Sequence, residues 1–359
     1  MTAQVQPTEE TYSGAAGAKV FPGWDSRRYN YFEPKGRKAT HYEDVTVDVQ
    51  PDPERYLAQG WIIEFADGTP TYSKNWTQLK SSDWHAYRAP DQEWERNHYQ
   101  RQSTIVGMIQ NVISNGRQSG APKRFDKKWV TILRDHLGAY KHVEYGLGTA
   151  LMHAQRLGYT QMVNNSILTN ASYKLRLAQD ITLYLSELGL DLPELDASAG
   201  KRHWLEDPIW QKAREAIEGV MGTNDYMEQY FATNVVVEPL VCELFRSGFI
   251  MQVAAGQNDF MTPAVISAGE ADYERNLANT VELLSILTAD TTHGADNRSI
   301  LEGWLKDHAE RAVAAAQQLQ PIWSLPTSKR AQFAGVFAAQ LNRVNTICEG
   351  IGISPLVRS

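Results

Sequence analysis

From about residue 91 onward, apolar residues recur at the three- and four-residue steps of an amphipathic α-helix. Asp91 and Asp126 are candidate N-caps for the first two helices. The pattern predicts an all-α bundle over residues 91–359. Its expected helices span 91–116, 126–158, 160–188, 208–218, 224–256, 262–287, 296–320 and 328–350, with a loop over 191–206.

Residues 1–90 follow a different pattern, with many Pro, Gly and aromatic residues and little helical periodicity. Residues 45–49 alternate between valine and polar residues as a short strand would, until Pro51 and Pro53 stop the alternation. Disordered tails are poor in aromatic residues, so we expect an irregular arm that buries its rings, with a partner chain as the favoured surface. The candidate interface residues are Trp24, Tyr29, Tyr31, Phe32, Trp61 and Trp84.

Three of the predicted helices carry a glutamate on their apolar face. Glu144, Glu238 and Glu270 each lie in a row of apolar and aromatic residues spaced at helical steps. A carboxylate in such a position needs a cation, a metal or a proton. One possibility is the di-iron site of a ferritin-like bundle, which takes a glutamate from each of two helices and a Glu-x-x-His pair from each of the other two. The other possibility is that the three glutamates are structural and bond to Arg, Lys, Tyr or His across the bundle.

The pairs that would complete a di-iron site are missing. On the helix that follows Glu144, Lys174 and Leu177 stand at the spacing of a Glu-x-x-His pair, and Glu270 is followed by Tyr273 instead of histidine. An ammonium group repels iron, leucine cannot bind it, and non-haem iron sites use imidazole ligands. We therefore predict a ferritin-like bundle without catalytic, cofactor-binding or metal-ligating residues, in which these positions are vestigial.

Charge pairing is the expected replacement for the metal. Lys174 is predicted to reach Glu144 because the two lie on neighbouring antiparallel helices joined by a short connection. Arg275 and Tyr273 are the predicted partners of the other two glutamates, as a cation and as a hydrogen-bond donor. A buried charge left without its partner costs about 3–5 kcal/mol, so such pairs are expected to be kept together.

Composition narrows the possible functions. The net charge of −7 and the isoelectric point near 5.8 argue against a nucleic-acid partner. Cys242 and Cys348 are the only cysteines, which is typical of buried thiols in a reducing cytoplasm. The N-terminal residues lack the charged and apolar regions of a signal peptide, and no run of about 18 apolar residues predicts a membrane span. We therefore expect a cytoplasmic protein.

Several segments resemble a known family. Residues 84–91 (WHAYRAPD), followed by Trp94 and Tyr99, resemble the approach to the first bundle helix in the small (β) hydroxylase subunits of bacterial multicomponent di-iron monooxygenases. Residues 29–34 (YNYFEP), 59–61 (QGW) and 67–68 (DG) also look familial. Ala89 replaces a residue that is often acidic in the family, so no role is assigned to it. The length and the pairing of features most resemble the propane 2-monooxygenase type, whose members act on propane, acetone or phenol.

The resemblance implies a ribonucleotide reductase-like, ferritin-like fold and a chain that carries no active site. It implies a larger α subunit that holds the di-iron centre in an α2β2 hydroxylase. It also implies a coupling protein and a reductase with FAD and a 2Fe-2S cluster, which brings electrons from NADH. The complex would insert one oxygen atom of O2 into a small hydrocarbon or a phenol.

Two other functions remain open at this point. One is a self-sufficient di-iron oxidase that uses Glu144, Glu238 and Glu270. The other is a helical scaffold protein with no enzyme partner. The sequence does not identify the physiological substrate, because the substrate pocket is expected in the other chain.

Overall fold

A computed structural model describes residues 29–34, 37–50, 64–68, 73–196, 198–327 and 331–356. Within these residues the chain is built of helices and loops, as the apolar pattern predicts. The α-helices are α1 (Glu95–Gln118), α2 (Lys127–Ile132), α3 (Gly138–Ala154), α4 (Gln161–Gly189), α5 (Ala199–Glu206), α6 (Pro208–Met221), α7 (Tyr226–Phe231), α8 (Met251–Val253), α9 (Met261–Thr288), α10 (Gly294–Leu319) and α11 (Phe333–Gly350). Wider π-helical turns form η2 (Glu43–Val47), η4 (Leu133–Leu137), η5 (Ala232–Glu243) and η6 (Arg246–Ile250), and 3-10 turns form η3 (Pro122–Arg124), η7 (Ala254–Gln257) and η8 (Gln320–Ser324).

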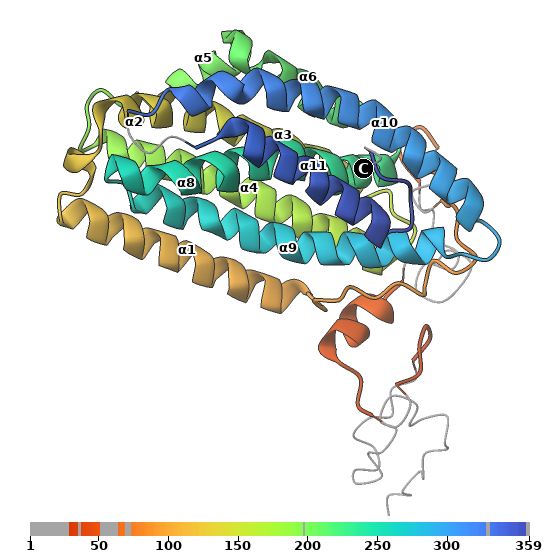
Figure 1. Cartoon of the computed structure of the whole chain (residues 1–359). Helices are drawn as coiled ribbons and strands as arrows, with labels where there is room; N and C mark the ends of the chain where they lie inside the picture. Colours follow the sequence, from red (N-terminus) through yellow and green to blue (C-terminus); the bar gives the residue numbers. More distant parts are fainter. Residues whose placement is uncertain are drawn as a thin grey trace, which may run out of the picture.

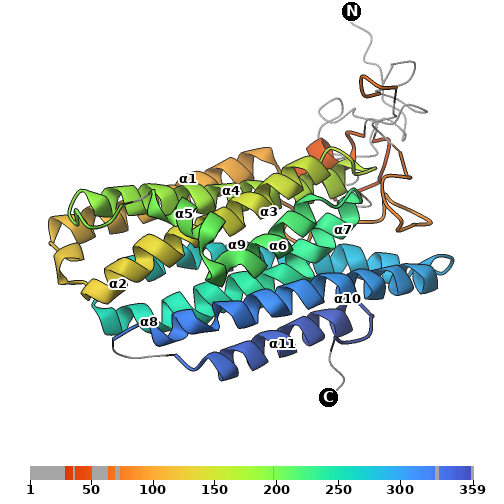
Figure 2. The ribbon, with the colours of Figure 1, turned by 90° about the horizontal axis from the view of Figure 1, so that it is seen from above.

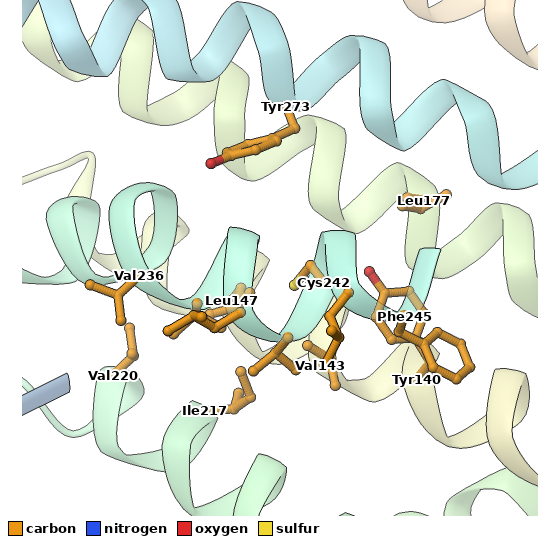
Figure 3. Packing of buried hydrophobic residues seen from close by; sticks show 14 of the residues in the cluster. Tyr140, Val143, Leu147, Leu177, Ile217, Val220, Val236, Cys242, Phe245 and Tyr273 are labelled. Atoms are coloured by element: carbon orange, nitrogen blue, oxygen red, sulfur yellow. The ribbon is translucent and has the colours of Figure 1, made fainter. Parts of the chain in front are cut away.

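The long helices run along one common direction (Figure 1). The antiparallel pair α3 and α4 packs with η5, η6 and α9 to form the centre of the bundle. Seen from above, α1 and α4 lie on one side, whereas α10 and α11 cover the opposite side (Figure 2). The apolar core fills the space between α3, α6 and η5, where Val143 and Leu147 face Ile217 and Val236 (Figure 3).

One of the two predicted N-caps is confirmed. The Asp126 carboxylate accepts hydrogen bonds from the backbone N–H groups of Lys128 (2.9 Å) and Trp129 (3.2 Å) at the start of α2. At the start of α4 the Thr160 hydroxyl accepts a hydrogen bond from the Val163 backbone N–H, and this cap was not predicted. The prediction for Asp91 is wrong, because α1 begins at Glu95 with Trp94 as its N-cap residue.

The predicted loop over 191–206 is also wrong in part, because α5 forms there. This short helix packs against α3 and η4 through two glycines that face each other. A Cβ atom on Gly200 would lie 2.3 Å from the carbonyl carbon of Gly138. Only a pair of glycines allows the two backbones to approach so closely.

The alternating residues 45–49 do not form a strand. They lie within and just after the π-helical turn η2, and Val47 is buried against the bundle. The Gln50 amide donates hydrogen bonds to the backbone carbonyl groups of Thr46 (3.0 Å) and Val47 (2.9 Å). These bonds close the C-terminal end of the turn, and tertiary packing therefore overrides the local alternation.

The helix predicted over 224–256 is a continuous helical path with an irregular centre. It begins as α7, widens into the π-helical segments η5 and η6, and ends as α8. Pro239 lies inside η5 and lacks the N–H group that a regular α-helical turn requires. Its presence accounts for a local departure from α-helical winding.

The described part of the N-terminal segment packs against the bundle. Leu79 and Trp84 are buried, and the Ser82 backbone N–H donates to Asp290, which precedes α10. Tyr29 is buried and Tyr31 stacks on the His85 ring at 5.1 Å. Four of the predicted interface residues, Tyr29, Tyr31, Phe32 and Trp84, therefore contact other parts of the same chain. Trp24 and Trp61 lie outside the described residues, so the interface role of the arm stays a prediction.

Candidate functional site: a buried ion cluster in the bundle

Five charged side chains meet at the centre of the bundle. Glu144 comes from α3, Lys174 from α4, Glu238 from η5, Arg246 from η6 and Glu270 from α9. All except Glu270 are almost fully buried, and the Glu270 side chain retains 20% of its exposure. The elements that carry these side chains are the helices on which the sequence predicted a vestigial metal site.

Lys174 bridges two of the glutamates. Its Nζ lies 3.1 Å from Glu144 Oε2, which confirms the predicted pair. The same ammonium group also donates a hydrogen bond to Glu238 Oε1. One lysine on α4 therefore ties α3 to η5.

Arg246 contacts all three glutamates, one with each guanidinium nitrogen. Its Nη1 lies 2.7 Å from Glu144 Oε1, its Nη2 lies 2.8 Å from Glu238 Oε2, and its Nε lies 2.6 Å from Glu270 Oε1. The Tyr140 hydroxyl accepts a hydrogen bond from Arg246 Nη1 at 2.9 Å and donates one to Glu144. The planar guanidinium fork suits such multiple recognition of carboxylates.

The charges in the cluster stabilise one another. Burial alone would raise the pKa of Glu144, but the positive charges of Lys174 and Arg246 hold that pKa below its usual value. Burial alone would lower the pKa of Lys174 and of Arg246, but the glutamates raise both. Glu144 and the two cations are therefore ionised near neutral pH.

Arg246 was not among the residues that the sequence predicted for this cluster. In a regular α-helix, a residue eight positions after Glu238 is turned about 80° away from it. The π-helical winding of η5 and η6 turns the chain less per residue, and Arg246 is brought round to the glutamates. Pro239 was the signal that the helix is irregular here, although it does not predict the amount of rotation.

The predicted partners of Glu238 and Glu270 are wrong. Arg275 pairs with Asp272 on its own helix and not with either glutamate. The Tyr273 hydroxyl donates a hydrogen bond to the backbone carbonyl oxygen of Asn234 at 2.9 Å. Arg246 makes the contacts with Glu238 and Glu270 that were predicted for Arg275 and Tyr273.

Leu177 packs beside the cluster and completes its apolar wall. Its side chain is buried and lies on the same side of η5 as Tyr273 (Figure 3). A Cβ atom on Gly269 would lie 2.6 Å from Leu177 Cδ2 and 3.4 Å from Arg246 Cδ. Glycine at this position of α9 therefore leaves room for both side chains.

The residues of the cluster do not fit a di-iron centre. Among the described residues, the one group whose ligand atoms lie within 4.8 Å of one another is Glu144, Glu238 and Cys242, and it contains no imidazole. Both carboxylates of this group are engaged by Lys174 and Arg246, and burial raises the pKa of the Cys242 thiol far above its usual value. The cavity among these side chains measures about 10 Å³. That volume is near the minimum for one water molecule and far below that of a substrate pocket.

The chain is similar to known proteins over most of its length. Residues 61–291 match the family described as Methane/Phenol/Alkene Hydroxylase. The chain is 40% identical, over 93% of both chains, to the hydroxylase component small subunit of propane 2-monooxygenase from Gordonia sp. (strain TY-5). It is 39% identical, over 98% of both chains, to the protein of the same description from Mycolicibacterium smegmatis. Identity to the methane monooxygenase component A beta chain of Methylosinus trichosporium is 26%, over 85% of this chain and 80% of that one.

Solved structures show the same fold at low sequence identity. A chain of toluene 4-monooxygenase superposes with a TM-score of 0.70 at 21% identity, covering 83% of this chain and 98% of that one. A chain of phenol hydroxylase from Pseudomonas sp. OX1 gives a TM-score of 0.75 at 15% identity, covering 90% of this chain and 94% of that one. The prediction of an all-α, ferritin-like bundle is confirmed. None of the helices in the described part of the chain contains an apolar stretch that could span a membrane.

Proposed function

The chain belongs to the methane/phenol/alkene hydroxylase family, as a hydroxylase small subunit, and we propose that it supports a larger subunit that holds the di-iron centre. The observation that carries this proposal is the cluster of Lys174 and Arg246 with three glutamates. The two cations occupy the part of the bundle where a working di-iron protein uses its carboxylates for metal. The chain's contribution is therefore structural, and it carries no catalytic residue.

The proposed assembly is an α2β2 hydroxylase in the cytoplasm. Its di-iron centre belongs to the α subunit and supplies the activation of O2. A reductase with FAD and a 2Fe-2S cluster delivers electrons from NADH, and a coupling protein regulates the hydroxylase. Propane is the proposed substrate, since the relatives at 39–40% identity are small subunits of propane 2-monooxygenases.

Reconstitution tests this function. The chain is co-expressed with a large hydroxylase subunit that contains two Glu-x-x-His motifs, and the purified complex is combined with reductase and coupling protein. We expect NADH- and O2-dependent oxidation of propane by the complex, and loss of that activity when either hydroxylase subunit is omitted. Oxidation by this chain without the large subunit would establish the self-sufficient oxidase instead. Failure to bind any large subunit would favour the scaffold protein.

A further inference from the structure

The outward side of α4 is unusual for a helix in contact with water. Within α4, all of which the structure describes, the charged residues are Lys174, Arg176, Asp180 and Glu187, and the first three are buried. The side chains that face away from the bundle are uncharged as far as Ser186. Leu168 and Leu183 are among them, and they are 40% and 50% exposed.

Other helices of the same bundle have an ordinary solvent side. On α6, Lys212 pairs with Glu215 at 2.7 Å and Arg214 pairs with Glu218 at 2.6 Å, and all four side chains are exposed or half-buried. Such charged pairs are typical of a helix face that stays in water. The contrast indicates that the outward side of α4 is covered by something other than water.

The outward residues of α4, all exposed except the half-buried Leu175, follow a helical packing pattern. Leu168, Leu175, Gln179, Thr182 and Ser186 recur at steps of seven, four, three and four residues. This is the spacing by which one helix presents a continuous ridge to another. Side chains at these positions are apolar, small or amide-bearing, so they suit close packing against a second helix.

The neighbouring helices extend this surface on both sides. On α3, Tyr145 is 57% exposed and Met152 lies seven residues further along the same side. A groove of about 500 Å³ separates Tyr145 from Leu175 and Gln179. A second groove of about 700 Å³ lies between α1 and α4 beside Leu183. Figure 2 shows α4 between α1 and α3, on the side of the bundle opposite α10 and α11.

The few charged side chains near the two grooves give little basis for binding a charged partner. In the groove between α1 and α4, Arg117 is bound within the chain by Glu187 and by Asp191 at 2.6 Å. Lys141 borders the groove between α3 and α4 and is half-buried. A partner that docks here gains packing contacts rather than charge complementarity.

We propose that this uncharged face, formed by Tyr145, Met152, Leu168, Leu175, Gln179 and Leu183, is the surface on which the large hydroxylase subunit sits. The assignment rests on the function proposed above. Depletion of charge is typical of the buried core of a stable interface, whereas charges at an interface mainly provide steering and specificity. The ridge and its two grooves fit a partner whose contacting helices are uncharged.

The size of the face agrees with a stable interface. The 29 residues of α4 make a helix about 44 Å long. A strip that includes the flanks of α1 and α3 is about 20 Å wide, because packed helices lie 8–10 Å apart. The resulting area of about 800–900 Å² matches the share of one partner in a standard stable complex.

The test places charge on the face without disturbing the bundle. Gln179→Arg and the double variant Leu168→Arg/Gln179→Arg change exposed side chains of α4, and the two like charges of the double variant cannot pair with each other. The matched control is Gln317→Arg, at an exposed position of α10 on the opposite side. Circular dichroism and thermal unfolding of each isolated chain verify that the helices and their stability are unchanged, and binding to the purified large subunit is then measured by titration.

We expect affinity to fall about tenfold in the single variant and about a hundredfold in the double variant, with no change in the control. Undiminished binding by the double variant, while the wild-type chain binds, would overturn this inference and leave the proposed function intact. If the wild-type chain does not bind the large subunit at all, the proposed function fails as well. If sedimentation shows that the wild-type chain pairs with a second copy and the variants do not, the face is a homodimer contact and the assignment is overturned.

Discussion

At the residue scale, the arrangement around Arg246 explains how two buried carboxylates and the half-buried carboxylate of Glu270 are held together by ion pairs. The guanidinium presents three nitrogens in one plane, and each meets a glutamate from a different element. Lysine cannot reproduce this contact, because its single ammonium group has no fixed fork geometry. The second cation, Lys174, then bridges the remaining oxygens of Glu144 and Glu238.

Removing the guanidinium is expected to be costly. Arg246→Met leaves three carboxylates with Lys174 alone, and we expect the free energy of unfolding to fall by about 3–5 kcal/mol. Arg214→Met on α6 is the control, since its pair with Glu218 is largely exposed and contributes at most about 1 kcal/mol. Urea unfolding of the two variants measures the difference. Equal losses would show that the buried cluster contributes no more than a surface pair.

Glu243 is expected to make stability depend on pH in the opposite sense to an ordinary salt-bridged carboxylate. Burial raises its pKa from 4.5 to about 7, although Arg343 opposes the shift. Because the folded state binds the proton more tightly, this group stabilises the fold fully below pH 4.5, and the contribution is lost as pH rises through 7. The shift corresponds to about 3 kcal/mol.

The comparison with Glu243→Gln isolates this contribution. Unfolding free energies of both proteins are measured between pH 4.5 and 7.5. The difference between wild type and variant should change steadily across this range, in favour of the wild type at the acid end. A constant difference would show that Glu243 titrates normally.

At the scale of elements, the 3.6-residue repeat predicted the long helices, because their apolar faces are continuous. The same repeat placed Glu144 and Lys174 on facing stripes, and their contact followed. It did not predict Arg246, because the rotation of η5 and η6 depends on how far the π-helical turns unwind the chain. The short helix α5 was also missed, because its formation depends on a close backbone contact with residues distant in the sequence.

That close contact makes a specific prediction for α5. Gly200→Ala would place a methyl group 2.3 Å from a backbone carbon of Gly138, so one helix must move. We expect a loss of about 1–3 kcal/mol in unfolding free energy. Gly303→Ala on α10 is the matched control, since a Cβ there meets nothing within 4 Å and alanine favours the helix by about 1 kcal/mol. A neutral result for Gly200→Ala, measured by thermal unfolding, would contradict the packing of α5.

At the scale of the whole molecule, the bundle has a fold that supports di-iron chemistry in other proteins and a centre that uses its carboxylates for ion pairing. Its surface includes a side of α6 with exposed charged pairs, typical of contact with water, and the uncharged face of α4. Ion pairs within the chain occupy the centre of the bundle, and the uncharged face of α4 is the proposed contact with the larger subunit.

The isolated chain is therefore expected to bind no iron. After anaerobic incubation with Fe(II) and desalting, metal analysis should find far less than one iron per chain, and neither iron nor a chelator should change the unfolding temperature. The large subunit treated in the same way serves as the positive control. Two irons per chain with a di-iron absorption spectrum would refute the prediction.

The geometry around Arg246 also has an evolutionary consequence. Restoring a metal site would require the loss of Arg246 and Lys174 together with the gain of histidines near Leu177 and Tyr273. Loss of either Arg246 or Lys174 alone would leave buried carboxylates without a cation, and this would lower the stability of the fold before any metal could bind. The three contacts of one arginine therefore oppose a stepwise conversion of this cluster into a metal site.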